Sequence, residues 1–235
     1  MSKPFTPLSK LPSFDPHTVA VTAVDSHLPV VSSQYLTPAA LRQRFIAPPV
    51  WKPDFNEEGR YADRPIMHAS VLVPIVLRDE PMVLLTERTA HLSTHSGQIA
   101  FPGGKADEGD ADAAATALRE AQEEVGLDPR FVDVLGHLSV YVTGSSFIIT
   151  PVVALVQPDF VMTPNANEVA DVFEVPLAFL MNPSNHRHHV FEHDGRLREW
   201  LSMPYMDLSR SPPKQRFIWG ATAGMLRNFY RFLSA

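Results

Sequence analysis

The sequence contains no cysteine. Disulfide bonds, a cysteine nucleophile and a zinc site built from thiolates are therefore excluded. No apolar run approaches the roughly 20 residues that cross a membrane, and no N-terminal stretch has the pattern of a secretion signal. These absences lead us to expect a cytoplasmic protein with no membrane partner.

Positive charge is also scarce in this chain. It has 20 lysine and arginine residues against 26 aspartate and glutamate residues, which gives a formal net charge of −6. That balance argues against nucleic acid as a partner, because binding nucleic acid depends on many contacts to phosphates. An anionic small-molecule substrate would therefore depend on a few local cations. The composition indicates no particular oligomeric state.

Regular structure is expected to be sparse near the N-terminus, because ten of the 22 prolines lie in residues 1–66. We predict a partly irregular N-terminal extension over residues 1–66, followed by one domain over residues 67–235. Within the extension, a short helix is predicted at Pro38–Phe45, with Thr37 as its N-cap and Pro38 at its first position.

The remainder of the chain mixes strands and helices. Apolar runs and turn signals predict strands at residues 69–77, 82–86, 131–141, 148–156 and 168–175, and a hairpin of residues 189–192 and 198–203. Helices are predicted at residues 112–125, 177–181 and 217–233, and a loop at Phe101–Gly104. The elements show no regular βαβ alternation, so we predict an α+β fold with a mixed sheet.

Three glutamates crowd the end of the predicted helix 112–125. At about 100° per residue they cover an arc of about 100°: Glu120, Glu123 and Glu124. A narrow apolar stripe lies on nearly the opposite side: Ala114, Leu118, Ala121 and Val125. Asp110 is the predicted N-cap, and Gly126 is placed to end the helix.

The position of these glutamates conflicts with helix stability. The helix dipole disfavours negative charge in the last turn, and Glu120 and Glu124 form a like-charged i,i+4 pair. Arg119 offsets part of this repulsion through an i,i+4 pair with Glu123. A divalent cation would remove the conflict, because Mg²⁺ binds carboxylate oxygens and keeps several waters for a phosphate substrate.

Taken alone, the acidic cluster is more typical of a solvated helix face. The glycine-rich stretch Phe101–Gly104 changes that interpretation, because it ends 15 residues before Arg119. Glycine backbone without side chains can approach a metal ion and phosphates closely. The combination favours a metal site that faces a phosphate substrate.

The same residues resemble the Nudix box, whose family pattern is G-x5-E-x7-R-E-U-x-E-E-x-G-U, with U a bulky apolar residue. The second half of the pattern is matched by Arg119, Glu120, Ala121, Glu123, Glu124, Gly126 and Leu127. The first half departs from it, since Gly104 stands one residue too far from Arg119. Ala111 occupies the position of the early glutamate, for which Glu108 or Asp110 could substitute.

A second motif resembles the coenzyme A pyrophosphatases of that family, which carry L-L-T-x-R-[ST/A]-x3-R-x3-G-x3-F-P-G-G. The chain reads LLTERTAHLSTHSGQIAFPGG from Leu84 to Gly104, and nine positions match with the spacing intact. Ser93 stands where the pattern has a second arginine. Similar residues continue downstream, so the resemblance extends from about His68 to Leu226.

The resemblance implies a fold and a reaction. The fold would be the Nudix α/β/α sandwich, in which a mixed sheet lies between helices. The reaction would be hydrolysis of the diphosphate of coenzyme A to 3′,5′-ADP and 4′-phosphopantetheine, with Mg²⁺ or Mn²⁺ as cofactor. The small-molecule partner would be a nucleotide of the coenzyme A type.

The resemblance also implies roles for the acidic residues. Glu120, Glu123 and Glu124 would bind the metal, and one of them could serve as the base. Arg119 would orient these glutamates. Glu168 precedes a predicted strand, where many Nudix enzymes place a further acid that binds metal or acts as base.

Substrate contacts are expected from the segment before the box. Gly103 and Gly104 would present backbone groups to the metal and phosphates. Arg88 and Lys105 are the local cations best placed to bind phosphate.

Two alternatives stay open from the sequence. Another substrate of the same family, such as ADP-ribose or NADH, is the first, because Ser93 breaks the coenzyme A pattern. The second is a Nudix-fold binding module without catalysis. Such modules often lose the metal carboxylates, whereas this chain retains all three.

Overall fold

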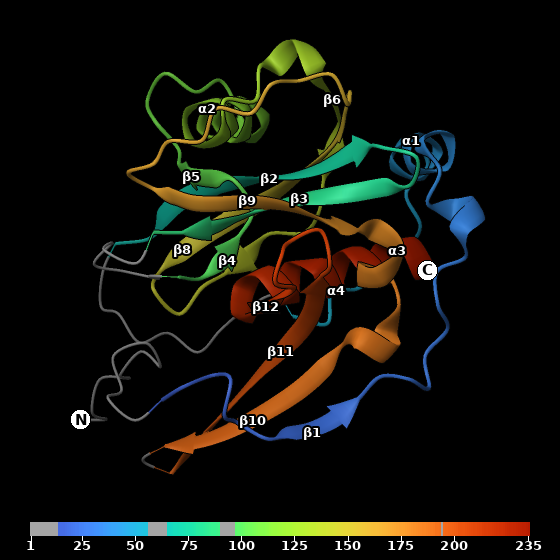
Figure 1. Ribbon diagram of the computed structural model, residues 1–235, viewed down its shortest axis with the longest axis vertical. Coiled ribbons are helices and arrows are strands. Elements are labelled where there is room, and N and C mark those ends of the chain that lie inside the picture. Colours follow the sequence, from blue (N-terminus) through green and yellow to red (C-terminus); the bar gives the residue numbers. More distant parts are fainter. Residues whose placement is uncertain (1–13, 56–64, 90–96, 194) are drawn as a thin grey trace.

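The computed structural model describes residues 14–55, 65–89, 97–193 and 195–235 (Figure 1). The strands are β1 (Val21–Val24), β2 (Met67–Leu77), β3 (Pro81–Arg88), β4 (Ile99–Ala100), β5 (Gly103–Lys105), β6 (Val132–His137), β7 (Tyr141–Val142), β8 (Phe147–Val156), β9 (Val169–Pro176), β10 (Arg187–His193), β11 (Arg196–Asp207) and β12 (Lys214–Trp219). The helices are α1 (Pro38–Ile46), α2 (Ala113–Val125), α3 (Leu177–Leu180) and α4 (Gly220–Ser234), with 3₁₀ turns η2 (Ser33–Tyr35), η3 (Pro129–Phe131) and η4 (Pro183–Asn185).

The described strands form two sheets. The larger has eight strands, with β4, β3, β2, β8 and β6 side by side, β5 paired with β2, β7 with β8, and β9 with β3. The β2–β8 pair is parallel and the other pairs are antiparallel, so this sheet is mixed. The smaller sheet has the antiparallel order β1, β10, β11, β12.

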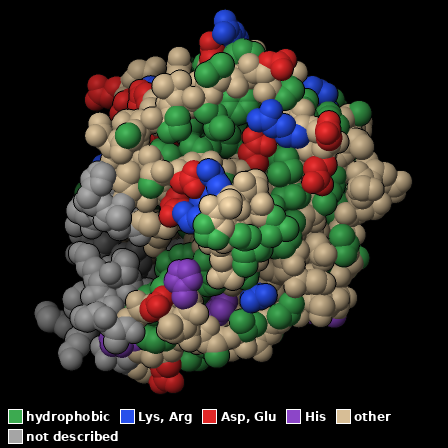
Figure 2. All heavy atoms as spheres, in the orientation of Figure 1, with side chains coloured by type: hydrophobic (Ala, Val, Ile, Leu, Met, Phe, Trp, Pro, Cys, Tyr) green, Lys and Arg blue, Asp and Glu red, His purple; other side chains and the backbone are tan. Residues whose placement is uncertain are grey.

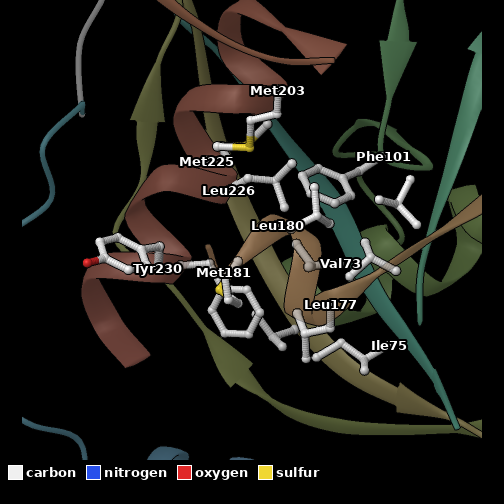
Figure 3. Close-up of a cluster of buried hydrophobic side chains, with 14 of the residues drawn as sticks. Val73, Ile75, Phe101, Leu177, Leu180, Met181, Met203, Met225, Leu226 and Tyr230 are labelled. Carbon is white, nitrogen blue, oxygen red and sulfur yellow. The ribbon is translucent and has the colours of Figure 1, made fainter. Parts of the chain in front are cut away.

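The large sheet is covered on both faces. Helix α2 lies on one face, and α4 lies on the other, between the large sheet and the small one (Figure 1). Along β2, Leu72 and Val76 join the core on the α2 side, whereas Val73 and Ile75 join the core on the α4 side. Figure 3 shows the second of these cores, where side chains of α4 meet those of the sheet. Burial on both faces explains why β2 is an almost continuous apolar run.

The predicted α+β fold, with a mixed sheet between helices, is confirmed. The predicted strands 69–77, 82–86, 148–156 and 168–175 correspond to β2, β3, β8 and β9. The predicted strand 131–141 divides into β6 and β7, and the predicted hairpin forms from β10 and β11.

The region before β2 contributes to the core. Helix α1 forms as predicted, and the Thr37 hydroxyl accepts a hydrogen bond from the Ala40 amide at 3.3 Å. Leu41 is fully buried in the core on the α4 side. Arg44 donates to the backbone oxygens of Leu233 at 2.8 Å and Ala235 at 2.9 Å, which satisfies carbonyl groups at the end of α4.

Two element assignments from the sequence are wrong. Phe101–Gly104 is not wholly a loop, because Gly103–Lys105 forms β5 and pairs with β2. The last helix begins at Gly220 instead of Phe217, because Lys214–Trp219 forms β12 alongside β11. Neither β1 nor β12 was predicted. Both depend on distant partner strands, which local periodicity does not reveal.

None of the helices in the described ranges is long and apolar enough to cross a membrane. Figure 2 shows acidic and basic side chains interspersed on the face in view, without a continuous basic surface. That distribution agrees with the excess of acidic residues in the sequence.

Candidate active site

Helix α2 brings its carboxylates against the edge of the large sheet. Its N-cap is Asp112, whose side chain accepts from the Ala115 amide at 2.8 Å, so the prediction of Asp110 as the cap is wrong. Gly126 ends the helix in the left-handed conformation, with φ of 71°, as predicted. Ala117 and Ala121 are fully buried, and their small size lets the helix pack closely on the sheet.

Glu124 is the most buried of the three clustered glutamates, with 4% of its surface exposed. It follows Ala121 by three residues and Ala117 by seven, so it shares their face of the helix. The prediction that all three glutamates lie opposite the apolar stripe is therefore wrong for this residue. Its Oε2 accepts a hydrogen bond from the Gly103 amide at 3.1 Å.

Burial raises the pKa of the Glu124 carboxyl to about 7. The Gly103 N–H and the charge of Arg88 oppose that rise, while the charges of Glu120 and Glu168 add to it. The Arg88 guanidinium lies 3.6 Å from Oε1 of Glu124. A buried carboxylate with a perturbed pKa beside a cation is typical of functional sites.

Glu120 lies next to Gly104, the second glycine of β5. A Cβ atom on Gly104 would overlap the Glu120 carboxylate, so glycine at this position lets the carboxylate lie directly against the backbone. Burial raises the pKa of Glu120, and the ion pair with Arg119, at 2.8 Å, opposes the rise. Gly104 therefore places backbone atoms directly against a second carboxylate of the cluster.

Arg119 connects the glutamates to the loop before the helix. Its guanidinium donates to both carboxylate oxygens of Asp110, at 3.0 and 2.9 Å, and to the Lys105 backbone oxygen at 2.9 Å. These bonds hold the pKa of Asp110 well below its usual range. Asp110 therefore anchors the arginine that contacts Glu120, a role that the sequence did not reveal because the two residues are nine positions apart.

A loop after β8 brings Glu168 to the same place. The backbone amides of Thr163 and Asn165 donate to the carbonyl oxygens of Val125 and Glu124, both at 2.9 Å, at the end of α2. The Asn165 side chain then donates to Oε1 of Glu168 at 3.3 Å. The Glu168 charge raises the pKa of both Glu120 and Glu124, so its carboxylate lies within their electrostatic reach.

Two other predicted residues, Glu123 and Lys105, contact Arg119, the first through its carboxylate and the second through its backbone oxygen. Glu123 has 60% of its side chain exposed and lies 3.3 Å from the Arg119 guanidinium. The Lys105 ammonium lies 6.0 Å from the centre of the Phe147 ring. Ser93, where the coenzyme A pattern has an arginine, lies outside the described residues.

The donors in this cluster suit a divalent cation. Among the residues that the structure describes, no three carboxylate or imidazole groups already stand in the arrangement of a metal cluster. The negative charge of Glu168 nevertheless raises the pKa of both Glu120 and Glu124, and the charge of Glu120 also raises the pKa of Glu124, so carboxylate charges repel one another at this place. Oxygen ligands are those that Mg²⁺ and Mn²⁺ prefer, and a cation among them would offset that repulsion.

Comparison with known proteins identifies the family. The family model for the NUDIX domain matches residues 67–208. The chain is 42% identical over 160 residues to the Nudix hydrolase NudL of Escherichia coli K12, covering 68% of this chain and 79% of that one. It is 40% identical over 179 residues to NudL of Shigella flexneri, covering 75% and 85% of the two chains. The chain therefore belongs to the Nudix family. It is a Nudix hydrolase, of the class that acts on diphosphate bonds in derivatives of nucleoside diphosphates.

Two solved structures are similar to about half of this chain. An Ap4A hydrolase of Caenorhabditis elegans in a binary complex is 18% identical with a TM-score of 0.42, covering 51% of this chain and 86% of that one. The NUDIX domain of Shewanella oneidensis NrtR, solved with ADP ribose, is 22% identical with a TM-score of 0.39, covering 51% and 79%.

Proposed function

We propose that this Nudix hydrolase cleaves the diphosphate of coenzyme A, and of its derivatives, to 3′,5′-ADP and 4′-phosphopantetheine. The observation that carries the proposal is the buried Glu124 carboxylate, which lies between the Gly103 amide and the Arg88 guanidinium. Both of these partners belong to the Leu84–Gly104 segment that resembles the coenzyme A signature. The proposal places the enzyme in the cytoplasm, with Mg²⁺ or Mn²⁺ as its cofactor.

The acidic cluster would hold the metal ion. Glu120 beside Gly104 and Glu124 beside Gly103 would supply carboxylate oxygens, and Glu123 and Glu168 would complete the set. When bound, the metal would lower the pKa of a water molecule and neutralise charge on the diphosphate. Nudix hydrolases generally use divalent metal ions of this kind.

The protein's own groups would position the substrate and accept a proton. Arg88 would bind a phosphate oxygen next to the cluster, and Lys105 would also bind phosphate. Gly103 and Gly104 let the chain approach the diphosphate, because a side chain at either position would collide with its surroundings. Arg119 would keep Glu120 in place. One of the three α2 glutamates would accept a proton from the attacking water near neutral pH.

The deciding experiment compares substrates and identifies products. Purified protein would be incubated with coenzyme A, ADP-ribose or NADH in Mn²⁺ or Mg²⁺, and the products identified by mass spectrometry. We expect 3′,5′-ADP and 4′-phosphopantetheine, with the highest kcat/KM on coenzyme A. Equal or faster turnover of ADP-ribose or NADH would reject the coenzyme A assignment.

Site variants test the residues separately from the substrate. Glu120→Gln, Glu123→Gln and Glu124→Gln should each abolish metal-dependent hydrolysis. Glu192→Gln is a matched control, because Glu192 is an exposed carboxylate on β10 in the small sheet. Activity that survives all three site changes would refute the assigned metal cluster.

ADP-ribose or NADH remains the second candidate substrate, because Ser93 replaces one arginine of the coenzyme A pattern. A binding module without catalysis is less well supported. Glu120, Glu123 and Glu124 are all present, and Glu120 and Glu124 lie beside the glycine backbone.

A further inference from the structure

Arg216 is a buried arginine outside the acidic cluster. It lies on β12, and none of its side-chain surface is exposed. Its guanidinium makes ion pairs with carboxylates from three other strands: Glu87 of β3 at 2.9 Å, Asp171 of β9 at 2.7 Å and Asp207 of β11 at 2.9 Å. It also lies over the Phe173 ring, 4.1 Å from the ring centre. Arg216 thus joins the small sheet to the large one.

Two of these carboxylates oppose each other in the large sheet. Glu87 and Asp171 are direct cross-strand partners in the antiparallel β3–β9 ladder. Like charges at such positions destabilise a sheet. The planar fork of an arginine can bind two carboxylates at once, and Arg216 binds one with Nη1 and the other with Nη2. The exposed side chains of Lys214 and Arg210 add a second cation to each carboxylate.

This pair lies next to the candidate active site. The register of the ladder shifts between Glu87 and Arg88, and Arg88 reaches Glu124. The next residue, Thr89, donates its backbone N–H to the Glu168 carbonyl at 3.0 Å. The end of the β3–β9 ladder therefore positions both Arg88, the cation beside Glu124, and Glu168, the fourth acidic residue of the site.

We propose that Arg216 is a positioning residue for the active site. By neutralising Glu87 and Asp171, it keeps β3 and β9 paired at this end of the ladder. The paired strands in turn hold Arg88 and Glu168 beside the acidic cluster. Arg216 lies over Phe173, which belongs to the core on the α4 side, so Arg216 acts from the face of the sheet opposite α2 and Glu124. This inference rests on the proposed function, because it treats Arg88 and Glu168 as substrate- and metal-binding residues.

The test compares Arg216→Met with a control that removes the arginine partner of another carboxylate on β9. Arg78→Met removes an ion pair with Glu174, at 2.8 Å, towards the opposite end of β9. Both variants should lower the melting temperature. At an assay temperature where both variants are folded, only Arg216→Met should reduce kcat/KM and Mn²⁺ affinity. The expected loss is about 10-fold, the lower end of the range for losing a group bonded to a metal ligand, because Arg216 acts one contact further away.

Two further variants separate positioning from a general loss of stability. Arg216→Lys keeps the charge but lacks the fork that binds two carboxylates, so it should recover only part of kcat/KM. Adding Glu87→Gln and Asp171→Asn to Arg216→Met removes the repulsion itself, and should restore Mn²⁺ affinity and KM towards wild-type values. If Arg216→Met does not fold, Arg216→Lys and the triple variant still test whether Arg216 positions the active site.

Three outcomes would overturn the inference. The first is Arg216→Met with wild-type KM, kcat and Mn²⁺ affinity despite a lower melting temperature. The second is a triple variant that folds but stays as defective as Arg216→Met, and the third is a control Arg78→Met that is as defective as Arg216→Met. Failure of the coenzyme A assignment can be told apart from failure of this inference. In the first case the wild type would not cleave coenzyme A, while Mn²⁺ titration of the same variants would still test the role of Arg216.

Discussion

Replacing Glu124 with glutamine should stabilise the metal-free protein while it removes the hydrolytic activity. The carboxyl group is 4% exposed, and burial raises its pKa from 4.5 to about 7. The native state therefore holds the proton more tightly than the unfolded chain. Below a pH of about 4.5, both states are protonated and the group costs nothing. As the pH rises from about 4.5 to about 7, the native state loses stability relative to the unfolded chain, and the loss is complete above a pH of about 7.

The size of the effect follows from that pKa difference. It corresponds to about 3 kcal/mol of lost stability at alkaline pH. Glutamine keeps an oxygen that can accept the Gly103 amide but carries no charge. Glu124→Gln should therefore match the wild type at pH 4.5 and exceed it by up to about 3 kcal/mol at pH 8. Loss of a general base or metal ligand should lower kcat by about 100-fold or more.

The assay is urea denaturation in EDTA at pH 4.5 and pH 8, with kcat measured separately in Mn²⁺. Glu123→Gln is the stability control, because its side chain is 60% exposed and surface changes usually stay within about 0.5 kcal/mol. Added Mn²⁺ should reverse the order at pH 8, since a ligand stabilises the state that binds it. Equal stability of Glu124→Gln and wild type at pH 8 in EDTA would refute the assignment of a buried, repelled carboxylate.

Three further changes test other parts of the site. Gly104→Ala should lower kcat because the added Cβ overlaps the Glu120 carboxylate, and unchanged kinetics would show that the backbone need not approach that group. Arg88→Met should raise KM for a diphosphate substrate more than Lys105→Met does, because only Arg88 contacts the buried glutamate; steady-state kinetics showing the reverse order would make Lys105 the principal phosphate ligand. Asp112→Ala should cost about 1 kcal/mol through loss of the N-cap, measured by thermal denaturation, and no loss of stability would contradict the capping bond.

Local sequence patterns were sufficient for several parts of this structure. Thr37 followed by Pro38 defined the start of α1, and Gly126 defined the end of α2. Both signals act within one helical turn, where the chain's own neighbours satisfy its backbone groups. The glutamates of α2 and the glycines before it likewise indicated a phosphate-directed site, because their chemistry is specific and their spacing is short.

Other features depended on segments that are far apart in the chain. The burial of Glu124 follows from the packing of α2 on β5, and the anchor of Arg119 on Asp110 follows from the loop that precedes the helix. Neither contact leaves a periodic signal, because each joins residues that are not neighbours on one helix or strand. Their physical basis is tertiary packing and electrostatics, which local propensity does not encode.

The small sheet is the clearest case of secondary structure that depends on tertiary contacts. Residues 217–219 of β12 are predicted from local sequence as the start of a helix. In the structure they form a strand, because β11 supplies hydrogen bonds to β12 and the large sheet supplies carboxylates for Arg216. Arg216 and Glu87 are 129 residues apart in sequence. The sequence by itself determined the family, the start of α1 and the end of α2, and it predicted metal chemistry for the acidic cluster. Only the tertiary structure decided which carboxylate is buried and which cations hold the strands beside it, because desolvation and ion pairing arise when distant segments meet.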